Sequence, residues 1–211
     1  MKTSVAICLF VALLAPSIIA QEVPEDVWKK GVSLLGNKVG QITPRAFSAA
    51  VTNLCPETRF YMATMKMGPD DAWPELPNMN APVLFAVTTG KDATSLSSPE
   101  GICSFLCSFA KPVADELAAY QRAMVFAELL GGTVRIEIPE EESLLPGFVK
   151  QLPENWAVII AGTKSGYMVS FTLMTDPNIK YCVRYVLNIS RDGKTVELVK
   201  KETVYTYTGY E

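Results

Sequence analysis

The dipeptide Asp192-Gly193 lies between two long segments in which apolar and polar residues alternate. Asp-Gly in such a setting is typical of a tight β-hairpin turn. Pairing across the turn places Ile189 opposite Val196, so both strands share one apolar face. Farther along the hairpin this register breaks the apolar pattern, and we expect a β-bulge near Lys200-Lys201.

The rest of the C-terminal half favours further strands. Short apolar or alternating segments are separated by Gly, Pro, Asn and Asp, the residues that favour turns. These segments are residues 134–138, 156–161, 167–174 and 179–190. Together with the strand after Asp192-Gly193 they predict an antiparallel C-terminal meander of about five strands.

The N-terminal half has apolar residues at helical spacing. Helices are expected to begin at Pro24, at Thr43-Pro44 and at Ser97, each with a capping or first-turn signal. A fourth stretch runs from residue 113 to 130 and ends at a glycine pair. Strands are expected at 60–67 and 83–87. The sequence predicts an α+β fold, in which the N-terminal helices and a cysteine-bearing helix pack on one twisted, mostly antiparallel sheet.

The first 20 residues have the pattern of a secretory signal peptide. Lys2 precedes an apolar run from Val5 to Ala15, and the small residue Ala20 lies at a plausible cleavage point before Gln21. The run is shorter than the roughly 20 residues that span a bilayer. We therefore expect a secreted or periplasmic protein with one α+β domain over residues 21–211 and no membrane span. Its net charge of −3 becomes −4 without Lys2, which argues against a nucleic-acid partner.

Export also sets expectations for the cysteines. Loss of Cys8 leaves Cys55, Cys103, Cys107 and Cys182, an even number in an oxidising compartment, which predicts two disulfide bonds. Four residues apart on a helix, Cys103 and Cys107 share a face but are badly placed to bond to each other. We expect one to bond to Cys55 and the other to Cys182, in either order. A redox or metal site on this pair is the less favoured alternative, because the spacing is not Cys-x-x-Cys.

The chain has no histidine, which limits its catalytic chemistry. Ser-His-Asp and Cys-His catalysis and histidine zinc sites are excluded. Paired carboxylates can hydrolyse glycosides without histidine, and Glu154 beside Trp156 is the first candidate for such chemistry. No catalytic residue is assigned, and neither a metal nor a cofactor is expected.

Asn188 begins the sequence Asn-Ile-Ser, a glycosylation sequon. It lies near the tip of the predicted hairpin, an accessible position. Asn188 is therefore a candidate glycosylation site in a cell that glycosylates exported proteins.

The strand that ends at Ser190 has two unlike faces. Ile179, Tyr181, Val183, Tyr185, Leu187 and Ile189 share one face, and Lys180, Cys182, Arg184, Val186 and Asn188 share the other. A cysteine helix bonded to Cys182 would cover the second, more polar face. The tyrosine-bearing face is then covered either by the protein's own elements or by a ligand or partner. In the latter case the binding residues are Tyr181, Tyr185, Trp156 and Tyr167.

These observations favour a non-catalytic function. The leading hypothesis is a secreted, disulfide-stabilised domain that binds a small apolar ligand or a protein partner. One alternative is a glycosidase-like hydrolase that uses Glu154. Another is a self-associating structural or surface component.

Overall fold

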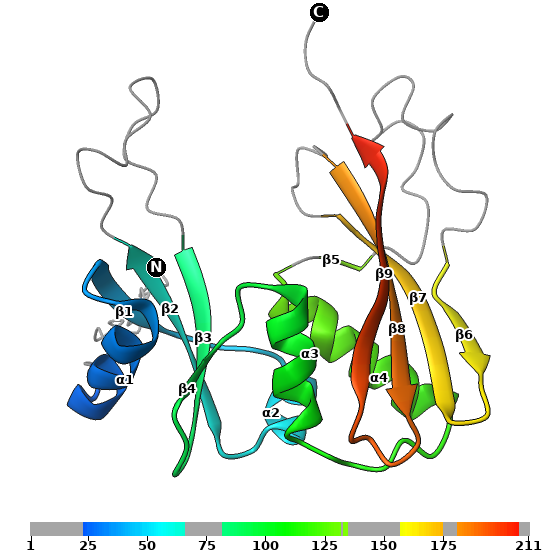
Figure 1. The fold of residues 1–211 in the computed structure, drawn as a ribbon, viewed down its shortest axis with the longest axis horizontal. Helices are drawn as coiled ribbons and strands as arrows, with labels where there is room; N and C mark the ends of the chain where they lie inside the picture. The colour runs from blue at the N-terminus through cyan, green and yellow to red at the C-terminus, as the bar shows by residue number, and fades with distance from the viewer. Residues whose placement is uncertain (1–22, 66–81, 132, 135–156, 175–180, 207–211) are drawn as a thin grey trace, which may run out of the picture.

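The computed structural model describes residues 23–65, 82–131, 133–134, 157–174 and 181–206 (Figure 1). Within these ranges the chain forms four helices and nine strands. The helices are α1 (Glu25–Leu35), α2 (Ala49–Leu54), α3 (Pro99–Cys107) and α4 (Glu116–Leu129). The strands are β1 (Val39–Arg45), β2 (Thr58–Met65), β3 (Pro82–Thr88), β4 (Ala93–Ser95), β5 (Thr133–Val134), β6 (Ile159–Gly162), β7 (Gly166–Met174), β8 (Tyr181–Ser190) and β9 (Val196–Thr206).

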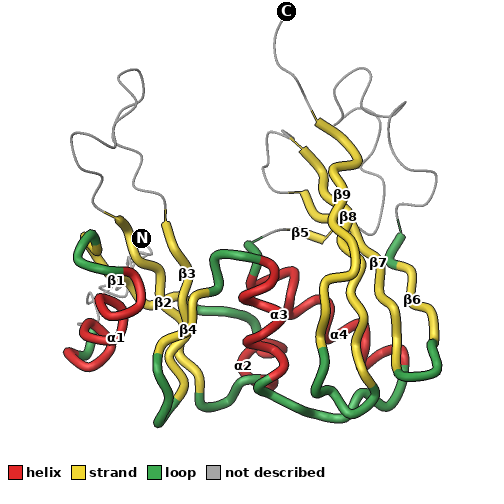
Figure 2. Tube along the Cα trace, in the orientation of Figure 1, coloured by secondary structure: helices red, strands yellow, loops and turns green. Residues whose placement is uncertain are grey.

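The α+β class is confirmed, but the strands form two antiparallel sheets where one was expected (Figure 2). The first sheet has the order β1-β2-β3-β4. In the second, β7, β8 and β9 are neighbours, and both β5 and β6 pair with the other edge of β7. Because β6 pairs near the start of β7 and β5 near its end, these five strands occupy four positions.

The expected helix start at Thr43-Pro44 is wrong, and this error concealed the first sheet. Thr43 pairs with Met62 and Pro44 with Tyr61 in the β1–β2 ladder. Proline is tolerated here because β1 is an edge strand, where a missing N–H need not remove a ladder hydrogen bond. Helix α2 begins only at Ala49 and has six residues.

The first sheet is covered on both faces, which explains the unbroken apolar sequence of β3. Phe85 and Val87 pack in a cluster with Val27 of α1. Leu84 and Ala86, on the opposite face, belong to the larger core that includes α3 and α4. Successive side chains of a strand point to opposite faces, so a strand buried on both sides has no polar position.

The β8–β9 hairpin has the predicted register. Leu187 pairs with Leu198, whereas the next pair joins Val186 to Lys200. Val199 is therefore the extra residue of a β-bulge, next to the predicted position. It is 53% exposed.

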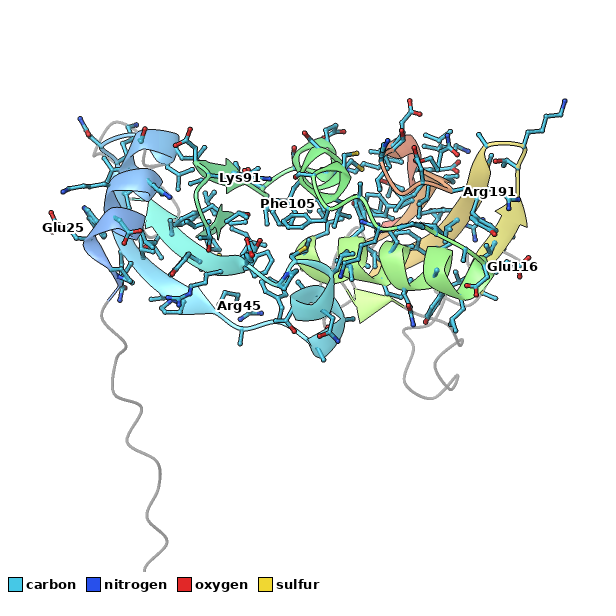
Figure 3. All side chains as sticks on the ribbon, turned by 90° about the horizontal axis from the view of Figure 1, so that it is seen from below. Glu25, Arg45, Lys91, Phe105, Glu116 and Arg191 are labelled. Carbon is cyan, nitrogen blue, oxygen red and sulfur yellow. The ribbon has the colours of Figure 1, made fainter. Side chains whose placement is uncertain are left out.

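Helix α3 lies between the two sheets (Figures 1 and 3). It begins one residue later than predicted, because the Ser98 hydroxyl, not that of Ser97, accepts a hydrogen bond from the Gly101 amide at 3.1 Å. Phe105 points into the core and lies 6.0 Å, between ring centroids, from Phe60 of the first sheet. Residues of both sheets thus contribute to one core cluster around α3 and α4. No helix in the described part of the chain is long and apolar enough to cross a membrane.

Candidate functional site

Helix α4 covers the tyrosine-bearing face of the second sheet. Tyr185 is 3% exposed, and its ring lies 5.8 Å from Phe126 of α4 and 6.0 Å from Phe171 of β7. Tyr167 is 6% exposed and donates a hydrogen bond from its hydroxyl to the Ala114 carbonyl at 3.0 Å. Both tyrosines are core residues and line none of the clefts described below. Trp156 and the side chain of Tyr181 lie outside the described part of the chain.

The cysteine pair of α3 faces the edge of β9. The Val196 amide donates to Cys107 Sγ at 3.2 Å, and the Cys107 thiol donates to the Val196 carbonyl at 3.6 Å. The Leu198 amide likewise faces the Cys103 thiol. Cys103 and Cys107 are separated by a helical rise of about 6 Å, and Val196 and Leu198 by about 6.8 Å of strand. The spacing of the two thiols therefore matches that of the two backbone groups. The thiols satisfy polar groups at an otherwise open sheet edge.

This placement overturns the expected bond from α3 to Cys182. Cys107 lies beside Val196, whose partner Ile189 is seven residues along β8 from Cys182, a distance of about 23 Å. Cys103 lies beside Leu198, whose partner Leu187 is five residues along β8 from Cys182, a distance of about 16 Å. A disulfide needs Cα atoms within about 7 Å. The structure has no disulfide among the four described cysteines, and α3 lies against the edge strand β9 of the second sheet rather than over its polar face.

Two of these thiols are poor nucleophiles. Burial raises the pKa of Cys55 to about 11 and that of Cys103 to about 12. A thiol that stays protonated at neutral pH neither attacks nor binds metal readily. In the described ranges, moreover, no three cysteine or acidic side chains gather closely enough to hold a metal ion.

Two other candidates are only partly described. Asn188 lies on the outer face of β8, half-buried, opposite Met168 of β7 and Glu197 of β9. Its glycosylation is still a prediction. Glu154 lies outside the described ranges.

A cleft between α2 and α4 combines apolar walls with a buried charged side chain. Its volume is about 330 Å³, at the lower end of the range for small-molecule sites. One wall is α2, the other is α4, and the connector between α3 and α4 closes one end. The lining residues are Ala50, Asn53, Leu54, Lys111, Pro112, Val113, Ala118, Gln121, Arg122 and Val125.

A clamp between Ser48 and Glu128 holds the two helices apart at a fixed distance. One carboxylate oxygen of Glu128 accepts from the Ser48 amide at 2.7 Å, and the other accepts from its hydroxyl at 2.6 Å. Ser48 is the residue immediately before α2, so the clamp attaches the start of this short helix to the end of α4. The two walls are therefore joined to each other without a ligand.

Arg122 forms the floor of the cleft and organises the connector. Its side chain is 4% exposed. Nη1 donates to the carbonyls of Leu106 and Phe109 at 3.3 and 3.0 Å, and Nη2 donates to that of Lys111 at 3.0 Å. Burial lowers the pKa of Arg122, but an arginine remains charged in proteins. The Leu106 carbonyl, in the last turn of α3, also accepts from the Phe109 amide at 3.1 Å. The carbonyls of Phe109 and Lys111 belong to the connector, which Arg122 thereby attaches to α4.

The β8–β9 hairpin fixes the connector from the other side. The Val113 amide donates to the Arg191 carbonyl at 2.8 Å. Gly193, at φ +70°, packs so closely that a Cβ there would lie 2.0 Å from the Lys111 carbonyl oxygen. Gly193 thus has a second role besides the predicted turn, because it packs directly against the connector.

A second cleft, of about 390 Å³, lies where β1 and β2 meet α2. Phe47, Phe60 and Tyr61 line it together with Arg45 and Arg59. Both arginines are exposed. It therefore lacks the buried charge that distinguishes the α2–α4 cleft.

Sequence reasoning did not find the α2–α4 cleft. In α4 the apolar side chain of Leu117 is 63% exposed, whereas the charged Arg122 is buried, the reverse of what residue type alone favours. One feature of the sequence could have indicated a buried arginine. Arg122 has the small neighbours Ala118, Ala119 and Ala123, which leave room for its long side chain against the helix surface.

Comparison of the chain with models of protein families, with curated proteins and with solved structures found no match in any of the three. The candidate site is therefore defined by its geometry alone.

Proposed function

We propose that this protein is a non-catalytic binding domain that holds a small, mostly apolar ligand in the cleft between α2 and α4. The observation that carries the proposal is a cleft whose two walls are joined by direct hydrogen bonds. The Ser48–Glu128 clamp sets its width, and Arg122 sets its floor. Small-molecule sites are typically preformed, with apolar walls and a few placed polar groups.

The lining chemistry supports binding rather than catalysis. Leu54, Val113 and Val125 supply apolar wall, and the polar lining groups are amides and cations. None of the described lining residues is an acid, a histidine, a serine or a cysteine. Apart from Lys111, these residues therefore offer neither a nucleophile nor a general base of the usual kinds. Export, suggested by residues 1–20, is part of the same proposal.

The test uses N-phenyl-1-naphthylamine, a neutral apolar dye whose fluorescence rises when it leaves water. We expect saturable micromolar binding to the full chain. Ala50→Trp places an indole in the cleft from an exposed position of α2 and should abolish binding. Ala49→Trp is the matched control, since Ala49 is an exposed neighbour outside the lining. No dye binding, or equal binding by both variants, would contradict the proposal.

A further inference from the structure

We infer that the ligand of the α2–α4 cleft is an amphipathic monoanion, an apolar chain that ends in a carboxylate, and that Lys111 pairs with the carboxylate. This inference rests on the proposed function and specifies its ligand class. The first argument is the charge of the lining. Lys111 and Arg122 both carry positive charge, and none of the lining residues that the structure describes is acidic. A ligand with a negative charge at this end of the cleft is therefore electrostatically favoured.

Lys111 is held at the cleft but retains donors for a ligand. Its ammonium donates to the Asn53 carbonyl, at the end of α2, at 2.6 Å. An ammonium has three donor hydrogens, so two others are available. The side chain forms no ion pair with the described residues of the chain. A carboxylate at the mouth of the cleft would supply the missing counter-charge.

Arg122 supplies a second positive charge that its own contacts leave uncompensated. Its three hydrogen-bond acceptors are backbone carbonyls, which are dipoles and carry no net charge. The nearby Cys55 thiol does not neutralise it, because burial raises the pKa of Cys55 to about 11. A charge at such a buried position acts over a longer range than one in water. Its field therefore adds to that of Lys111 at the same end.

The donor set indicates a carboxylate rather than a phosphate. Phosphate sites usually combine several backbone amides or a helix N-terminus with basic side chains. The end of the cleft instead receives the C-terminal turn of α2, whose Asn53 carbonyl points to Lys111. Carbonyl oxygens repel a dianion more strongly than a monoanion.

The cleft volume limits the length of the chain. Its 330 Å³ corresponds to roughly eleven liquid water molecules. An alkyl chain of about eight to ten carbons with one carboxylate fills a comparable volume. Leu54, Val113 and Val125 line the apolar part of that path.

The experiment compares decanoate, decanol and decyltrimethylammonium as competitors of the neutral dye, below their micellar concentrations at pH 7. We expect decanoate to displace the dye at least tenfold more tightly than decanol, and the cation to be the weakest. Lys111→Met keeps the aliphatic stem and removes the charge, and it should reduce the ratio of decanoate affinity to decanol affinity to about one. Lys164→Met, an exposed lysine outside the cleft lining, is the matched control and should bind as the parent does.

The outcomes separate this inference from the proposed function. Failure of the dye to bind contradicts both. Equal displacement by decanoate and decanol leaves the proposed binding function intact and overturns the anionic ligand. Preference for decanoate that survives Lys111→Met overturns the role of Lys111. Unfolding midpoints of both variants, measured in urea, show whether the folded fraction is equal.

Discussion

At the scale of single residues, Arg122 has the most consequential side chain of the described structure. Its guanidinium is 4% exposed and provides the donors for three carbonyls at the end of α3 and in the connector. Arg122→Met should lower the free energy of unfolding by about 2 kcal/mol, because the part-buried carbonyls of Phe109 and Lys111 lose their guanidinium donor and an unsatisfied carbonyl costs about 1–3 kcal/mol. Urea unfolding followed by circular dichroism measures this change. Gln121→Met, on an exposed neighbour, should change stability by less than about 0.5 kcal/mol, and an equal loss in both variants would disprove the role of Arg122.

The buried thiols predict a loss of stability at alkaline pH. Burial raises the pKa of Cys55 to about 11 and of Cys103 to about 12, from an ordinary value of 9.0. The folded protein therefore holds these protons at pH values where the unfolded chain loses them. Their contribution is fully present below about pH 9 and is lost as the pH rises toward 11 and 12. By pH 10 the two thiols should lower the unfolding free energy by about 2 to 3 kcal/mol.

Urea midpoints at pH 7, 8, 9 and 10 test this effect. Tyrosines and lysines also titrate above pH 9, so the comparison is with Cys55→Ala/Cys103→Ala. The double variant starts from a lower stability, because it leaves cavities, but its slope between pH 8 and 10 should be clearly shallower. Parallel slopes would show that the thiols do not contribute.

At the scale of elements, local sequence signals located most helices and strands, and long-range contacts decided their partners. The pair Cys103 and Cys107 was correctly expected to share a helix face. Its partner is the edge of β9, however, and no rule of sequence spacing indicates which strand edge a helix will reach. The Ser48–Glu128 clamp joins residues 80 apart in the sequence. The α2–α4 cleft could not be predicted for the same reason, since it exists only where two distant helices meet.

The hairpin and the α3–α4 connector offer a test with an internal control. Gly193 and Gly90 have nearly equal φ angles, +70° and +72°. Alanine at either position costs about 1–2 kcal/mol for the left-handed conformation. A Cβ at Gly90 meets nothing within 4 Å, whereas one at Gly193 lies 2.0 Å from the Lys111 carbonyl oxygen. Gly193→Ala should therefore be clearly more destabilising than Gly90→Ala in urea unfolding, and equal losses would mean that the hairpin does not press on the connector.

At the scale of the whole molecule, the main question is whether the two sheets fold as one unit. Alternation and the Asp192-Gly193 turn predicted the strands β6 to β9, but neither their separation into a second sheet nor the pairing of both β5 and β6 with β7. The first sheet was only partly predicted, because β1 contains the helix-like signal Thr43-Pro44 and β4 has three residues. The two sheets meet through α3, whose Phe105 lies beside Phe60 of the first sheet and belongs to the core cluster that also contains Leu187 of the second. A shared core of this kind favours a single cooperative unfolding transition.

Phe105→Ala tests that coupling. Removing a buried phenylalanine ring costs about 3–5 kcal/mol. If the sheets unfold together, native-state hydrogen exchange should show that the amides of Ala86 in β3 and Leu187 in β8 lose the same protection free energy. Val27→Ala, in the separate cluster between α1 and the first sheet, is the control for a cavity outside the shared core. Loss of protection in β3 alone, with β8 unchanged in Phe105→Ala, would mean that the sheets unfold separately and that residues 21–211 are not one domain.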